Sequence, residues 1–160
     1  MKITGTYTLN LPAGQAYTAM QNPEILAKAI PGCESLERIG EDEYRMKMKM
    51  VLASLSGVFE GKVRIADQTP PDSFRLIVEG TGKIGFVKGD GLLKLAAVDE
   101  GTEITYDGDA QIGGTIASVG QRLIDGTAKM MIKKFFERLT KQTQEAQAPE
   151  SGEAPPPAEN

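Results

Sequence analysis

The chain has 160 residues, with 18 Lys and Arg against 22 Asp and Glu, a net charge of −4 and no histidine. The missing histidine excludes serine–histidine and cysteine–histidine nucleophile pairs, and one cysteine, Cys33, cannot build a sulfur–imidazole zinc site. All the cations lie at or before Lys141 and four of the acidic residues lie after it, so residues 1–141 carry no net charge, which argues against nucleic-acid binding.

The sequence also bears on the compartment. The first residues lack the apolar run of a secretory signal, and no segment reaches the ~20 consecutive apolar residues needed to span a bilayer. A single cysteine fits a reducing compartment. We therefore expect a cytoplasmic protein, with peripheral contact at the inner face of the cytoplasmic membrane as a further expectation.

The first 32 residues predict one strand and two short helices. Residues 2–10 alternate with a period of two, which is typical of a strand. A helix is expected over residues 13–20 and a second over residues 24–29, with Pro23 at its first position. Pro and Gly then end the second helix at residues 30–32.

The middle of the chain is predicted to be almost entirely strand. The clearest case is Tyr44, Met46, Met48 and Met50, which alternate with charged residues as in a half-buried strand. Residues 85–91 are rich in glycine and predict a flexible hairpin loop. The strands expected here cover about residues 33–39, 44–51, 59–65, 74–82, 84–86, 92–98 and 103–112.

A long helix is predicted over residues 115–142. Its apolar positions shift by roughly a quarter turn between the first and second halves, which indicates either a helix curving over a twisted sheet or a second half that covers a cavity or a partner. Residues 143–160 are rich in Pro, Ala and Glu and predict a disordered acidic tail, either inert or a tether. The predicted domain is therefore residues 1–142.

These elements predict an α+β fold: a curved antiparallel sheet of about seven strands wrapped around a long C-terminal helix, with two short helices after the first strand. This arrangement resembles the helix-grip fold of the START and Bet v 1 type. Within it, the motifs resemble the G-subunit family of carbon monoxide dehydrogenase over about residues 1–140. The matching stretches are Asn22-Pro23-Glu24, Ile30-Pro31-Gly32-Cys33-Glu34, Gly57-Val58-Phe59-Glu60-Gly61, Glu79-Gly80-Thr81-Gly82, Gly85-Phe86, Gly101-Thr102-Glu103-Ile104-Thr105-Tyr106, Gly113-Gly114-Thr115-Ile116-Ala117 and Gly120-Gln121-Arg122-Leu123-Ile124.

The resemblance implies a non-catalytic accessory protein of a molybdenum hydroxylase-type carbon monoxide dehydrogenase or a related oxidoreductase. Members of that family are associated with recruiting the enzyme to the cytoplasmic membrane, and some are similar to carriers of a quinone. Some members carry an apolar C-terminal anchor, which this tail lacks, so the resemblance does not imply permanent membrane attachment here. No tightly bound cofactor and no metal are expected, and a quinone or lipid would be the carried ligand.

An apolar internal cavity is the main candidate site, because methionine fills irregular space and repacks around flexible ligands. An ordinary methionine-containing core is the alternative. The residues expected to line the cavity are Met46, Met48, Met50, Phe59, Phe74, Leu76, Phe86, Leu93, Ile104, Tyr106, Leu123, Met130, Met131 and Phe135.

Two further regions are candidates for binding. Pro31, Gly32 and Cys33 are expected to form a loop at the cavity mouth, where Cys33 is an inert thiol because no histidine is present to activate it. A basic and aromatic set near the end of the long helix is expected either to complement the helix dipole or to contact a partner or anionic lipid. This set is Lys129, Lys133, Lys134, Phe136 and Arg138.

Three functions remain open. The leading one is a carrier or adaptor that serves an oxidoreductase at the membrane. The second is a docking module without a small ligand. The third is an enzyme of the helix-grip type, for which Tyr44 and Tyr106 are the only inward tyrosines available, since no catalytic residue is otherwise expected.

Overall fold

The computed structural model describes residues 1–147 of the chain. Seven strands form one antiparallel sheet in the order β1-β7-β6-β5-β4-β3-β2. The strands are β1 (Lys2–Leu9), β2 (Cys33–Gly40), β3 (Glu43–Leu52), β4 (Leu55–Thr69), β5 (Ser73–Gly82), β6 (Gly85–Val98) and β7 (Gly101–Gly113). The helices are α1 (Ala13–Ala19), α2 (Pro23–Ala29), a short 3-10 helix η1 (Thr115–Val119) and α3 (Gln121–Gln147).

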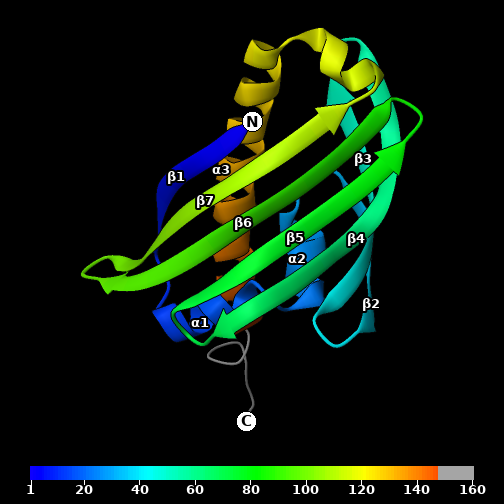
Figure 1. Ribbon diagram of the computed structural model, residues 1–160. Coiled ribbons are helices and arrows are strands. Elements are labelled where there is room, and N and C mark those ends of the chain that lie inside the picture. Colours follow the sequence, from blue (N-terminus) through cyan, green and yellow to red (C-terminus); the bar gives the residue numbers. More distant parts are fainter. Residues whose placement is uncertain (148–160) are drawn as a thin grey trace.

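The sheet is strongly curved and wraps around α3, as Figure 1 shows. The helices α1 and α2 close one end of the sheet, and η1 leads into α3 at the other end (Figure 1). In addition, α2 packs against both α3 and β2. This is the predicted helix-grip fold, with the predicted order of elements.

Alternation along each strand determines which side chains face α3. In β3, Tyr44, Met46, Met48 and Met50 point inward as predicted, and the Arg and Lys between them are exposed. Helix α2 begins as expected, because the Asn22 side chain accepts hydrogen bonds from two backbone N–H groups of the first turn and Pro23 follows it. The inner face of the sheet is therefore almost entirely apolar.

The predicted hairpin at residues 85–91 is wrong. These residues belong to one continuous strand, β6, which pairs with β5 on one side and β7 on the other. Gly89 lies opposite Ala110, and Gly91 lies opposite Gly108. Pairing on both sides supplies the backbone hydrogen bonds that outweigh the low strand propensity of glycine.

The long helix is divided at Gly120, whose φ of 102° is unfavourable for other residues. Beyond it, α3 buries one stripe that begins at Ile124 and continues through Ile132, Phe136 and Leu139. Leu123 falls on the exposed side of the helix. The predicted quarter-turn shift came from including exposed side chains in the apolar stripe.

The predicted domain boundary after residue 142 lies inside α3. The Thr143 hydroxyl is buried and donates a hydrogen bond of 2.7 Å to the Leu139 carbonyl, and the helix continues to Gln147. The remainder of the predicted disordered tail, residues 148–160, lies outside the described residues.

Candidate functional site

Two apolar cavities lie between the inner face of the sheet and α3. Chamber 1, of about 400 Å³, is on the side of α1 and α2 and is bounded there by Met20, Leu26 and Ile30. Chamber 2, of about 280 Å³, is on the side of η1 and is bounded there by Ile116 and Ile124. Chamber 1 by itself falls in the range of pockets that hold small molecules.

Most of the predicted lining residues do line a chamber. Met46 and Met131 line both. The predicted residues of chamber 1 are Met46, Phe74, Leu76, Leu93, Tyr106, Met131 and Phe135. The predicted residues of chamber 2 are Met46, Met48, Met50, Phe59 and Met131.

Chamber 1 exists because the middle of the sheet lacks side chains on its inner face. Gly89 and Gly91 of β6, and Gly108 and Ala110 of β7, all line it. These four positions form two cross-strand pairs, Gly89 with Ala110 and Gly91 with Gly108. A fully packed core would place larger side chains here. Glycine therefore creates space between the sheet and the helix.

Glycines have the same role in chamber 2. Gly61 of β4 and Gly80 of β5 are cross-strand partners, and both line this chamber. A Cβ at Gly61 would overlap the Glu79 carbonyl, so this position also needs the close approach of two backbones. The sequence-based candidates did not include these glycines. The signal that points to them is glycine at inward positions of otherwise apolar alternating strands.

Three hydroxyl groups belong to residues that line the chambers. Tyr44 donates a hydrogen bond of 3.0 Å to the Gln21 carbonyl, so its hydroxyl is already satisfied. Thr127, in α3, lines chamber 2. Tyr106 lines chamber 1, its ring lies across Gly5 of β1, and its hydroxyl has no hydrogen-bond partner among residues 1–147. Tyr106 is thus the lining residue of chamber 1 with an unbonded hydroxyl, and that hydroxyl lies against Gly5 of the edge strand β1.

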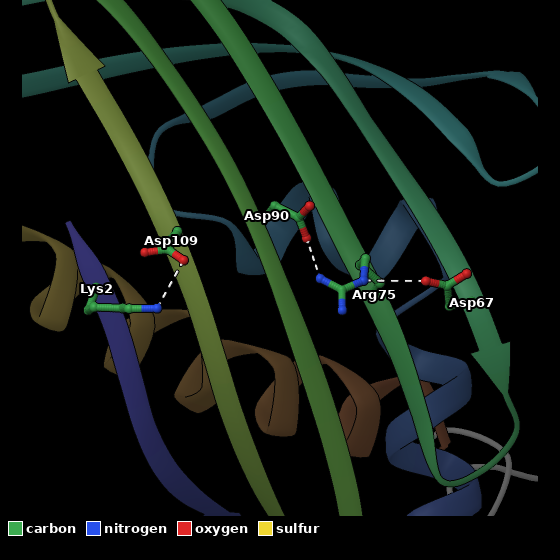
Figure 2. Close-up of polar contacts among 5 residues, drawn as sticks. All are labelled: Lys2, Asp67, Arg75, Asp90 and Asp109. Carbon is green, nitrogen blue, oxygen red and sulfur yellow. Dashed lines mark hydrogen bonds and ion pairs between the residues drawn. The ribbon is translucent and has the colours of Figure 1, made fainter.

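The carboxylates nearest the chambers belong to the outer face of the sheet. Asp109 forms an ion pair of 3.1 Å with Lys2, and Arg75 contacts Asp90 at 2.6 Å and Asp67 at 3.3 Å (Figure 2). The Asp109 contact raises the pKa of Lys2, and the Asp90 contact raises the pKa of Arg75. All these groups are solvent-exposed, so the pairs stabilise the fold little and supply no acid or base to the chambers.

Four residues predicted to line a cavity do not. In β6, Val87 faces chamber 2, so the adjacent Phe86 points to the other face of the sheet, where its ring covers Gly113. Ile104 has the right parity but lies fully buried in the packed core cluster beyond chamber 1. Leu123 and Met130 are 40% and 49% exposed on the outer side of α3. Three of these four errors have the same kind of cause. Phe86 was assigned to the wrong face of its strand, and Leu123 and Met130 were assigned to the wrong side of the helix, each next to a residue that does line a chamber.

Phe136 was predicted to contact a membrane or partner, and this is wrong. Its side chain is only 2% exposed. The ring stacks on Tyr7 with centroids 5.0 Å apart and makes an edge contact of 5.2 Å with Phe135. The other members of the predicted contact set, Lys129, Lys133, Lys134 and Arg138, are exposed, and none of them forms an ion pair within the described residues.

The predicted mouth loop contributes one residue to a chamber. Pro31 lines chamber 1, whereas Gly32 is exposed and Cys33 is half-buried without lining either chamber. Burial raises the pKa of the Cys33 thiol above its ordinary value, and the thiol lies 3.5 Å from the Ser35 carbonyl. No histidine is present to offset this effect.

Cys33 is therefore expected to react slowly. Because the thiolate is the nucleophile, iodoacetamide at pH 8 should modify native Cys33 more slowly than the same thiol in urea-unfolded protein. The pH at which the rate reaches half of its maximum should lie above 9.0, the ordinary pKa of a thiol. The measurement is alkylation followed by intact-mass spectrometry across pH. A native rate that levels off below pH 8 would show an activated cysteine instead.

Residues 1–147 offer neither a metal site nor a membrane-spanning helix. No group of three or more His, Cys, Asp and Glu in this part of the chain is placed to hold a metal ion. None of its helices is long and apolar enough to cross a membrane.

Known proteins match this chain in both sequence and fold. A conserved protein of Geobacillus kaustophilus has 34% sequence identity and a TM-score of 0.86, over 91% of this chain and 97% of that one. A START superfamily protein of Mycobacterium smegmatis has 11% identity and a TM-score of 0.68, over 91% and 99% of the two chains.

The Zhui aromatase/cyclase of Streptomyces sp. R1128 has 12% identity and a TM-score of 0.65, over 92% and 96% of the chains, which shows a shared fold alone. No curated protein matches. The family model for the G subunit of carbon monoxide dehydrogenase (CoxG) matches residues 5–144, which is nearly the whole described chain. The chain therefore belongs to the CoxG family of carbon monoxide dehydrogenase G subunits.

Proposed function

We propose that this chain is a non-catalytic accessory protein of a carbon monoxide dehydrogenase-type oxidoreductase. It carries an apolar, quinone- or lipid-like molecule in its two chambers and links the enzyme to the cytoplasmic membrane. The observation that carries the proposal is the pair of apolar chambers with glycine on their sheet side. Membership of the CoxG family supports the choice of partner enzyme.

The chemistry of the lining supports binding over catalysis. General acid–base catalysis needs a titratable group within hydrogen-bond reach of the reacting atoms. The carboxylates of Asp90 and Asp109 are exposed and paired on the outer face, and the Tyr44 hydroxyl is bonded to the Gln21 carbonyl. Tyr106 alone is free in chamber 1, and a single phenol suits recognition of a ligand oxygen.

The outer side of α3 supports the proposed link to a membrane or to the enzyme. Leu123 and Met130 are exposed there, and Lys134 lies one turn after Met130. Lys129, Lys133 and Arg138 add exposed cations to the same helix. Apolar side chains beside cations suit an anionic lipid surface, although the same set suits an acidic surface on a protein partner.

Extraction of a quinone from vesicles tests the proposal. The full chain is mixed with phospholipid vesicles that contain a menaquinone or ubiquinone analogue, and the vesicles are then removed by sedimentation. We expect about one quinone per protein in the supernatant, measured by absorbance after solvent extraction. Lipid in place of quinone would identify the carried class as lipid. A supernatant protein with neither molecule would overturn the carrier function and favour the docking module.

Tyr106 gives a more specific prediction. Tyr106→Phe should weaken quinone binding roughly three- to tenfold, because one hydrogen bond to the ligand oxygen is lost. Binding of a hydrocarbon of similar size should not change. Tyr7→Phe is the matched control, since Tyr7 stacks on Phe136 but lines neither chamber. Equal affinities for wild type and Tyr106→Phe would assign Tyr106 to packing alone.

A further inference from the structure

The two chambers share one wall. The residues that line both of them are Ile3, Met46, Val78, Ala110, Met131 and Ile132. A residue that lines both cavities lies where the two meet, and we call this set the partition between chamber 1 and chamber 2.

The partition contains four side chains that move little and two that move easily. Ile3, Val78 and Ile132 are β-branched and stiff at χ1, and Ala110 has no rotamers. Met46 and Met131 have three rotatable bonds each and adapt their shape at low cost. Met46 comes from β3 and Met131 from α3, so the flexible side chains belong to the two opposite walls.

We propose that Met46 and Met131 form a gate that opens the two chambers into one channel, and that the carried molecule is elongated and spans it. This proposal rests on the carrier function above. The polar end lies in chamber 1, where the Tyr106 hydroxyl is free, and the apolar chain passes the gate into chamber 2. The Thr127 hydroxyl of chamber 2 also makes no hydrogen bond within residues 1–147, but a helical threonine can turn onto the carbonyl four residues earlier, and the Tyr106 phenol has no such local partner.

The volumes give the expected length dependence. At roughly 30 Å³ for each water-sized group, chamber 1 holds about 13 such groups and chamber 2 about nine more. Each methylene that enters an apolar cavity should tighten binding about fourfold. A closed gate would end this increase when chamber 1 is full, whereas an open channel continues it to longer chains.

A series of straight-chain alcohols, from about eight to about eighteen carbons, tests the gate by displacement of a fluorescent apolar probe. For wild type, affinity should keep rising past the length that fills chamber 1. For Met46→Phe, it should stop rising at a shorter chain, with little change for the shortest alcohol. Met131→Phe, from the other wall, should do the same and replaces Met46→Phe if that variant folds poorly. Val51→Phe, in the same strand as Met46 but 64% exposed and lining neither chamber, is the control.

Three outcomes are distinguishable. An increase that ends at the same chain length in wild type and both gate variants would overturn the channel while leaving chamber 1 as a binding site. No binding at any length would overturn the carrier function itself. A larger loss of alcohol affinity in Thr127→Val than in Tyr106→Phe would contradict the orientation, because it would place the polar end in chamber 2.

Discussion

Gly89→Leu should abolish most ligand binding without destabilising the protein. Gly89 lies on the inner face of β6 and lines chamber 1. A Cβ at this position would have only the Asp109 carbonyl oxygen within 4 Å, at 3.8 Å. A leucine side chain can therefore enter the chamber without moving the backbone.

The expected effect on binding is large. The added side chain occupies the space of about four ligand carbons, and each buried methylene contributes about 0.8 kcal/mol. Affinity for a quinone analogue or a long alcohol should fall by about 100-fold or more, as measured by probe displacement. The free energy of unfolding should stay equal or rise, because leucine buries apolar surface and restricts the unfolded chain more than glycine does.

Two variants complete the design. Gly80→Leu places the same side chain in chamber 2, where the nearest atom to an added Cβ is the Glu60 carbonyl oxygen at 3.6 Å. Gly14→Leu, at an exposed position of α1 with nothing within 4 Å, is the matched control and should leave binding unchanged. Unimpaired binding by a folded Gly89→Leu protein would mean that ligands do not occupy chamber 1.

Phe136→Ala should lower the free energy of unfolding by about 3–5 kcal/mol. The ring is 2% exposed, stacks on Tyr7, packs edge-on against Phe135 and lines chamber 1, so its removal enlarges that chamber between α3 and the sheet. Urea unfolding followed by circular dichroism measures the change. The magnitude reflects lost burial, lost aromatic contacts and the added cavity volume.

Met130→Ala is the matched control for this change. Met130 lies on the same helix and is 49% exposed, so its truncation should alter stability by less than about 0.5 kcal/mol. The comparison also separates two roles for Phe136. A stable Phe136→Ala protein that no longer binds membranes or the oxidoreductase would restore the contact role that its burial argues against.

Much of the sheet could be predicted because alternation is a local property. Tyr44 to Met50 alternate with charged residues, and the structure places them on the inner face as expected. The face predicted for Phe86 is wrong, because residues 85–91 were expected to be a loop that divides the strand. The glycines inside β6 made it look like a loop in the sequence, although it is a strand that forms backbone hydrogen bonds with both β5 and β7.

The cavity itself could not be predicted from a set of large apolar residues. Its volume depends on what is missing from the sheet, and the positions that lack side chains come from β4, β5, β6 and β7. Gly91 and Gly108 lie opposite each other because of the strand register, and the sequence alone does not specify which residues of β6 and β7 pair. Methionines indicated the region correctly, but the glycines opposite them create the space.

The predicted contact surface on α3 is partly wrong because the sequence does not specify which side of this helix faces the sheet. The buried stripe of α3 begins at Ile124 and includes Phe136. Leu123, one residue before Ile124, is exposed. A helix of apolar and basic residues allows more than one phase until the sheet selects which face is covered. The cations of the predicted contact set are exposed, and their contact with a membrane or partner stays a prediction, whereas the aromatic residue placed among them is buried.

Native mass spectrometry of the freshly purified full chain, followed by denaturing extraction, tests the central claim most directly. The account predicts one apolar molecule per protein in the wild type, quinone- or lipid-like in mass, and its loss in Gly89→Leu. A wild-type protein that has the mass of the chain alone, and that stays empty after exposure to quinone-containing vesicles, would contradict the carrier function.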